Sequence, residues 1–267
     1  MQKPSASTPA LRAELAHKVI RRAILEQALV PGTKLPEDQL GAQFGVSRTL
    51  TRAVLGRLAS ESLVQIGNKR TATVAQPSID EARAVFEMRR CLEAEAVRLV
   101  MARWQPSMGS TLEGHVRDEE RAAQSGQVPV SIRLAGDFHT RLAQMAGNPL
   151  LERYLSEVVT RCSLILAVYG RPHSSDCACT EHHQLIEAFR SGNSEPAVQL
   201  MLEHLNGIEK RALLPTAVVN AAGLSGIFSR YADDVGTPSQ ALPLKSPRKS
   251  LRSPTTSIPP VTKRSSP

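Results

Sequence analysis

The chain has 267 residues, of which only 3% are aromatic, so it can form two helix-rich domains whose cores consist mainly of aliphatic side chains. Four cysteines in a chain of this length exclude a secreted disulfide framework, and no apolar run approaches the roughly eighteen residues that a membrane span needs. We therefore expect a protein of the reducing cytoplasm that does not bind membranes.

The net charge of +8 is distributed unevenly along the chain. Residues 1–76 carry 11 Lys and Arg against 5 Asp and Glu, whereas residues 77–234 carry 16 against 20. A basic head on an acidic body predicts that the head binds a polyanion such as DNA, although a merely solvated basic segment has the same composition.

The first 76 residues show the order of elements of a winged helix-turn-helix. Residues 1–10 are polar and are expected to be disordered, and the folded domain is expected over 11–76. Hydrophobic periodicity, Pro31-Gly32 and Gly45 divide this domain into three helices and a hairpin. The expected helices cover 11–28, 37–44 and 48–60. The hairpin is expected to consist of strands over 63–66 and 71–74, joined by a turn over 67–70.

The expected third helix has one apolar and one polar arc. Arg48, Thr49 and Arg52 share the polar arc, and the two arginines lie one above the other because they are four residues apart. Such a helix fits the major groove, where guanidinium groups pair with guanine edges or phosphates. Periodicity alone leaves open an ordinary amphipathic helix with solvated arginines.

The identity of the residues indicates a family. The chain closely resembles the DNA-binding domain of the GntR family of bacterial regulators over about 11–76, and the resemblance rests on Pro31-Gly32-Thr33-Lys34-Leu35-Pro36-Glu37, Leu40, Phe44-Gly45-Val46-Ser47-Arg48-Thr49, Arg52, Leu55, Arg57-Leu58 and Leu63-Val64. It implies contacts with double-stranded DNA from the helix and from the wing of the hairpin. The implied contact residues are Ser47, Arg48, Thr49, Arg52, Lys69, Arg70 and Thr71.

Three positions depart from the family pattern. Leu50 stands where Pro is frequent, Ala53 where Glu is frequent, and Thr71 where the wing often has Gly. Because Ala53 removes a side chain near the DNA, the preferred operator is expected to differ from that of close relatives.

The pattern from 79 to 214 is helical almost throughout, so the fold class is mainly α, with an all-α helical bundle after the winged helix-turn-helix. Gly147-Asn148-Pro149 separates two helices, because Gly suits a helix end and Pro a helix start. The expected helices cover 79–104, 106–125, 131–146, 149–169, 178–191 and 195–213.

Residues 235–267 are rich in Ser and Pro and carry 6 basic residues and no acidic one. We expect a disordered, solvated tail. The functional alternative is an additional non-specific attraction for DNA, which salt would weaken.

Three histidines of the body, His139, His182 and His204, each lie on the apolar face of a different expected helix. A single such histidine is usually a satisfied core residue. Three of them could meet inside a bundle and bind Zn²⁺ or a similar ion, and both readings stay open from spacing alone.

The body is also similar to the FCD effector-binding domain of the FadR-type branch of the GntR family, over about 80–213. The resemblance rests on Phe86-Glu87-Met88-Arg89, Leu92-Glu93, Phe138-His139, Leu142, Gly147-Asn148-Pro149-Leu150-Leu151, Glu181-His182, Ile186, Ala188, Ala197, Met201 and His204-Leu205. It implies that the three histidines bind one divalent metal ion. It also implies that a small carboxylate effector completes the coordination near a basic side chain such as Arg89.

One expected metal ligand is missing. Metal-binding members have Asp or Asn one helical turn before the first histidine, where this chain has Ala135. Asp137 lies roughly 200° around the helix from His139 and so cannot simply replace that ligand. The site is therefore expected to hold three histidines plus water or effector, or to be metal-free.

Other motifs are weaker. Cys177 and Cys179 with His182 and His183 fit no standard zinc-finger spacing, Asp118-Glu119-Glu120 is typical of a solvated helix face, and no P-loop, dinucleotide glycine motif or HExxH is present.

The sequence therefore predicts a homodimeric transcription regulator, in the commoner pattern a repressor, that binds a palindromic operator and responds to a small-molecule effector. Two alternatives remain at this point. A hydrolase-like enzyme would use the three histidines to activate water, and an architectural DNA-binding protein would use the body only to dimerise.

Overall fold

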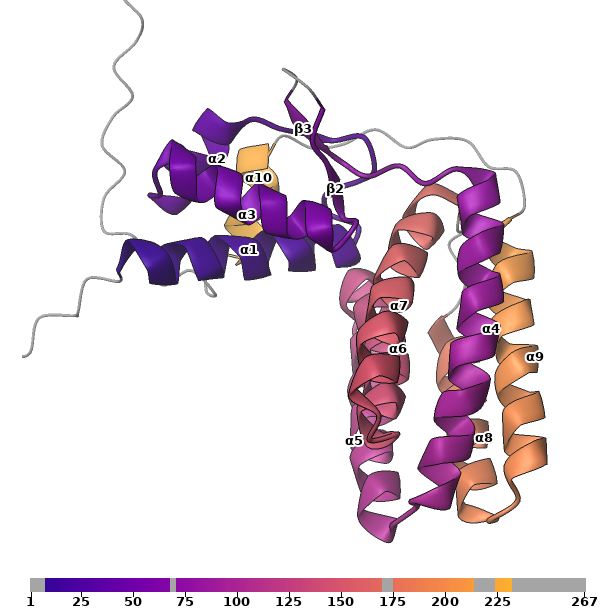
Figure 1. The fold of residues 1–267 in the computed structure, drawn as a ribbon. Coiled ribbons are helices and arrows are strands. Elements are labelled where there is room, and N and C mark those ends of the chain that lie inside the picture. The colour runs from indigo at the N-terminus through magenta and orange to yellow at the C-terminus, as the bar shows by residue number, and fades with distance from the viewer. Residues whose placement is uncertain (1–7, 68–70, 170–174, 214–223, 232–267) are drawn as a thin grey trace, which may run out of the picture. The chain divides into compact units, whose positions relative to one another are not determined.

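The structure, a computed structural model, describes residues 8–67, 71–169, 175–213 and 224–231 (Figure 1). Its elements in chain order are α1 (Pro9–Leu25), β1 (Lys34–Leu35), α2 (Glu37–Phe44), α3 (Arg48–Ser60), β2 (Val64–Gln65), β3 (Ala72–Val74), α4 (Ile79–Ala102), α5 (Pro106–Gln124), α6 (Val128–Met145), α7 (Pro149–Tyr169), α8 (Ser175–Arg190), α9 (Ser194–Ala212), α10 (Leu224–Phe228) and the 3₁₀ turn η1 (Ser229–Tyr231). The predicted tail and the predicted wing contacts Lys69 and Arg70 lie outside the described residues.

Helices α1 to α3 and a small antiparallel sheet form the N-terminal domain. The strand order is β1-β3-β2, with Lys34 opposite Thr73 and Val64 opposite Val74. Strand β1 was not predicted, because two residues are too short to show an alternating pattern. Its place is fixed by the preceding turn, where Gly32 has a φ of +82° and its backbone N–H donates to the carbonyl of Val74 at 2.9 Å.

The turn between α2 and α3 places the predicted recognition helix. Gly45 ends α2 in the left-handed region at φ +63°, a conformation that favours glycine. Ser47 then begins α3, because its Oγ accepts a hydrogen bond from the backbone N–H of Leu50 at 3.3 Å. Ser47 is therefore an N-cap as well as a predicted DNA contact.

Helices α4 to α9 form a helical bundle with its own aliphatic core (Figure 1). The predicted break at Gly147-Asn148-Pro149 separates α6 from α7: Gly147 has a φ of +63°, and the side chain of Asn148 accepts from the backbone N–H groups of Leu150 and Leu151. None of the described helices is long and apolar enough to cross a membrane.

Several predicted boundaries need correction. Helix α1 begins at Pro9 rather than 11, since Thr8 caps it by accepting from the N–H of Leu11, so disorder over 1–10 is wrong for Pro9 and Ala10. It ends at Leu25 rather than 28, because Gln27 takes a φ of +57°. Helices α6 and α8 each begin three residues earlier than predicted, and α10 with η1 was not predicted.

Candidate functional site

The outer face of α3 carries the predicted DNA contacts. Ser47, Arg48, Thr49 and Arg52 are all exposed, whereas Thr51, Val54, Leu55 and Leu58 are buried against the rest of the domain. Ala53 on α3 is also exposed, and so is Thr71, immediately before β3. The structure thus presents the predicted helix residues together on one accessible surface.

Two carboxylates of α2 hold the arginines of this surface. The Nε of Arg48 donates to Asp38 at 2.7 Å, and the Nε of Arg52 donates to Glu37 at 2.9 Å. Both arginine side chains remain more than 70% exposed, so these ion pairs contribute little to stability and can exchange for phosphate contacts. Glu37 and Asp38 were not predicted as partners of these arginines, because they lie on a different helix.

The three predicted histidines meet inside the bundle. His139 comes from α6, His182 from α8 and His204 from α9, and none is more than 4% exposed. Their nearest ring nitrogens all lie within 4.8 Å of one another. Of the two readings that the sequence left open, three separate core histidines or one shared cluster, the structure gives the shared cluster.

Each of these histidines is oriented by a glutamate. Nδ1 of His139 contacts Glu93 on α4 at 2.5 Å, Nδ1 of His182 contacts Glu119 on α5 at 3.0 Å, and Nδ1 of His204 contacts Glu181 on α8 at 2.5 Å. A carboxylate accepts, so each Nδ1 carries the proton and donates it. The Nε2 lone pairs are then free, and a carboxylate behind each imidazole is typical of metal-binding histidines.

The inward nitrogens fit a cation. Nε2 of His204 lies 3.3 Å from Nε2 of His139, and two lone pairs repel one another at this distance unless a positive charge lies between them. The buried Nε2 of His182 has no hydrogen-bond partner among the described residues. A tetrahedral Zn²⁺ with bonds of about 2.0–2.1 Å would hold its nitrogen ligands about 3.3 Å apart. The donor type, the orientation of the rings and the spacing of His139 and His204 therefore suit such an ion.

Electrostatics keep the cluster in its metal-binding form. Burial lowers the pKa of His139 to about 3, despite the opposing effect of Glu93, and burial also lowers the pKa of His204. Burial alone would raise the pKa of Glu93, but the charge of Arg89 and the hydrogen bonds from His139 and Arg89 outweigh it and bring this pKa to about 2. His139 and His204 are therefore neutral beside an ionised Glu93, and metal coordination requires neutral imidazoles.

Arg89 lies next to this cluster, but its charge is already paired. Its Nε donates to Glu93 at 2.6 Å and its Nη1 to the Sγ of Cys162 at 3.3 Å, while its buried Nη2 has no hydrogen-bond partner among the described residues. The guanidinium is therefore anchored by Glu93, and its Nη2 amino group can donate to a further acceptor.

Ala135 occupies the position where metal-binding relatives have Asp or Asn. Ala135 is half-buried on α6 one turn before His139 and offers no ligand atom. Asp137 pairs with Arg133 at 2.7 Å, so it does not compensate. Neither of these two α6 residues therefore adds a ligand to the one that His139 offers the cluster.

Glu119 corrects one prediction. It was assigned to a solvated acidic face, but its side chain is fully buried beside His182, while its neighbours Asp118 and Glu120 face outward or stand at the edge. The signal was helical spacing, since Glu119 follows Leu112, His115 and Val116 on the buried arc of α5. The zinc-knuckle alternative gains no support, because Cys179 packs in the bundle core, His183 pairs with Glu120 at 3.0 Å, and the Cys177 side chain lies outside the described residues.

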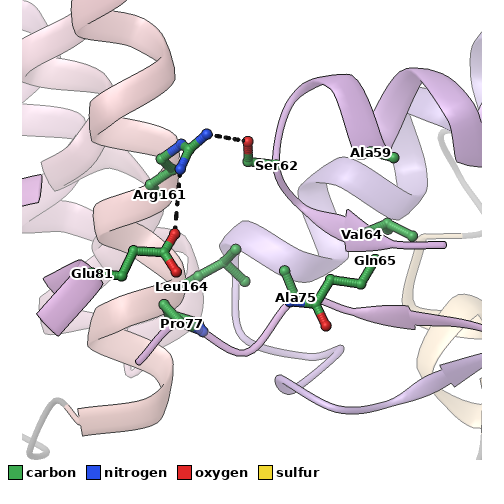
Figure 2. A pocket seen from close by; sticks show the side chains of 9 residues that line it. All are labelled: Ala59, Ser62, Val64, Gln65, Ala75, Pro77, Glu81, Arg161 and Leu164. Carbon is green, nitrogen blue, oxygen red and sulfur yellow. Dashed lines mark hydrogen bonds and ion pairs between the residues drawn. The ribbon is translucent and has the colours of Figure 1, made fainter. Parts of the chain in front are cut away.

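A separate pocket contains none of these groups (Figure 2). Its one cation, Arg161 on α7, donates to Ser62 at 2.6 Å and to Glu81 at 3.3 Å, so its charge is engaged by the protein. The other lining residues are Ala59, Val64, Gln65, Ala75, Pro77 and Leu164. The three-histidine cluster is the stronger candidate for a ligand site.

Comparison with known families agrees with this geometry. Residues 12–74 match the gntR family of bacterial regulatory proteins, and residues 84–207 match the FCD domain. The chain is a transcription regulator of the GntR type with an FCD domain. Its two matched segments contain the α3 surface and the three-histidine cluster respectively, and the family is one of regulators rather than enzymes.

Similar proteins carry the same kind of name. The HTH-type transcriptional regulator YdhC of Bacillus subtilis is 26% identical over 70% of this chain and 84% of its own length. The HTH-type transcriptional repressor NanR of Escherichia coli is 26% identical over 73% of this chain and 82% of its own. Escherichia coli McbR/YncC has the same fold, with a TM-score of 0.66 at 18% identity over 82% of this chain and 98% of its own.

Proposed function

We propose that this GntR/FCD regulator is a homodimeric repressor whose operator binding is controlled by a metal ion and a small carboxylate effector in the FCD domain. The observation that carries the proposal is the convergence of three Nε2 atoms, each backed by a glutamate, in a dry interior. A regulator domain that only dimerised would have no need for this arrangement.

His139, His182 and His204 would hold one divalent ion such as Zn²⁺. The ion would act as a Lewis acid that attracts an anionic oxygen. Because Ala135 supplies no ligand, water or an effector carboxylate can take the remaining coordination position. The free Nη2 of Arg89 is the nearby N–H group that we assign to the same carboxylate.

On the DNA side, Arg48 and Arg52 would exchange their carboxylate partners for guanine edges or phosphates, with Ser47, Thr49 and the wing residues Lys69, Arg70 and Thr71 as further contacts. One winged helix binds DNA weakly, so a dimer on a palindromic operator supplies the second half-site. We infer that effector binding shifts the dimer away from the DNA-binding arrangement and relieves repression.

The test is binding to operator DNA obtained by selection from genomic fragments. The expected result is one palindromic motif whose half-sites lie about one helical turn apart, or a multiple of it. Selection of fragments without a shared motif would contradict the proposal and favour an architectural role. A stoichiometric divalent ion in the purified protein supports the metal assignment, and a metal-free protein that gains no thermal stability from added Zn²⁺ contradicts it.

A further inference from the structure

The short segment Leu224–Tyr231 follows the FCD domain in the sequence but packs in the core of the DNA-binding domain. Ile227, Phe228 and Tyr231 are each at most 5% exposed there, in the same hydrophobic cluster as Ile20 and Leu55. Helix α10 lies beside α1 rather than beside α9 (Figure 1). The segment lies outside both matched families, which end at residues 74 and 207.

An aromatic contact and a hydrogen bond from Tyr231 to Glu26 hold the segment. The rings of Phe228 and Phe44 meet edge to face with centroids 5.3 Å apart, so α10 covers the end of α2. The hydroxyl of Tyr231 donates to Glu26 at 2.8 Å, and the guanidinium of Arg22 lies over the Tyr231 ring. The segment therefore contacts both helices that support α3.

Glu26 connects three parts of the chain. It is 5% exposed, and it accepts from Tyr231, from Arg22 on α1 at 2.9 Å and from Arg133 at 3.0 Å. Arg133 belongs to α6, the helix that also carries His139. Removal of Tyr231 would leave a buried carboxylate with one donor fewer, which is destabilising in a dry site.

We infer that Leu224–Tyr231 is an integral part of the DNA-binding domain: it docks on α1 and α2 of its own chain, completes the core beneath α3, and is required for full operator affinity. The segment is joined to the end of α9, which carries His204, through residues 213–223. The core of the DNA-binding domain thus includes residues that follow the FCD domain in the sequence.

Cross-linking in the full-length protein tests the docking and its intrachain nature. Phe44→Cys and Phe228→Cys are combined and treated with a short bifunctional thiol reagent, and each single variant controls for the native cysteines. An internally linked chain that migrates as a compact monomer on a denaturing gel is the expected result. Failure to link the two positions, or linkage only between two chains, would overturn the inference.

The functional part is tested with Phe228→Ala against Leu11→Ala, which removes a 58% exposed apolar side chain from the same domain. Phe228→Ala is expected to lower the Tm of the DNA-binding domain by about 5 °C or more and to weaken operator binding by about tenfold, because a smaller fraction stays competent. Leu11→Ala is expected to change neither. Equal behaviour of the two variants would overturn the inference.

Should Phe228→Ala not fold, Tyr231→Phe removes only the hydrogen bond to Glu26. It is expected to speed hydrogen exchange of the α1 and α3 amides in the full chain, while the exchange of α5 and α8 stays unchanged. Unaltered exchange in α1 and α3 would contradict the assignment. The loss of operator affinity rests on the proposed function, but cross-linking, thermal unfolding and hydrogen exchange need no operator, metal or effector, so the two kinds of failure are distinguishable.

Discussion

The α3 surface with its predicted DNA contacts and the three-histidine cluster both contain ion-paired side chains, but in opposite surroundings. On α3, Arg48 and Arg52 pair with carboxylates while both side chains stay more than 70% exposed. In the bundle, His139 and Glu93 pair at no more than 3% exposure. Water makes the first kind of pair weak and exchangeable, and its exclusion makes the second kind strict in geometry. A surface that must accept a new partner and a site that must hold a fixed shape differ in this way.

The largest expected effect is on DNA recognition. Arg48→Ala combined with Arg52→Ala removes two guanidinium groups worth about 1–3 kcal/mol each in base or phosphate contacts, so operator affinity should fall by about a hundredfold or more. Fluorescence anisotropy with a labelled operator measures it. Arg57→Ala, an exposed arginine on another arc of α3, is the matched control, and an equal loss in that variant would refute the assigned surface.

The buried side of the comparison predicts a large loss of stability. Glu93→Gln leaves the Arg89 charge without its counter-ion in the interior, so the free energy of unfolding should fall by about 3–5 kcal/mol. Glu87→Gln, on the exposed face of the same helix, should change it by less than about 0.5 kcal/mol. Denaturant unfolding monitored by circular dichroism decides, and similar midpoints for the two variants would contradict the account.

The third prediction concerns the affinity for Zn²⁺, which should depend on the glutamate that orients His182. Glu119→Gln removes the negative charge behind His182 while keeping most of the side chain, so Zn²⁺ affinity should fall by about 10–100-fold. Competition with a metal chelator measures the affinity. Glu120→Gln, whose carboxylate pairs with His183 near the surface, should leave it unchanged. Loss of affinity in both variants would indicate a general charge effect.

The exposed ion pairs of α3 predict that removal of a carboxylate raises the affinity for DNA modestly. Asp38→Asn frees Arg48 at a site where the ion pair is worth less than about 1 kcal/mol, so affinity for random DNA should rise by no more than about fivefold. Anisotropy at two salt concentrations tests this. A decrease in affinity would show that Asp38 positions Arg48 rather than competing for it.

The smallest effect concerns pH. Burial lowers the pKa of His115 below its usual value of about 6.5, so the unfolded chain takes up a proton first as the pH falls. The contribution of His115 is complete above about pH 6.5 and is lost progressively below it. His115→Gln should therefore lose less stability than the wild type between pH 7.5 and 5.5. Parallel losses in the two proteins would argue against this role.

The faces of single helices were easier to predict from the sequence than the contacts between side chains of different helices. The outward arc of α3 and the three apolar histidine stripes follow from helical spacing, which acts within one helix. The glutamates behind the histidines do not: Glu93 and His139 are 46 residues apart, and no local pattern pairs them. Glu119 was misassigned because its two acidic neighbours suggested a solvated run. The segment Leu224–Tyr231 was missed because one and a half turns of helix carry too little periodicity.

The most direct test of the central claim joins the two regions in one titration. Operator affinity is measured for metal-free and Zn²⁺-loaded protein across a panel of small carboxylates, in the wild type and in His182→Ala. We predict that at least one carboxylate shifts the affinity of the Zn²⁺-loaded wild type by about tenfold, and that His182→Ala binds the operator but does not respond. An identical response in His182→Ala, or operator affinity indifferent to both metal and carboxylates, would contradict the claim that the buried cluster controls the exposed surface.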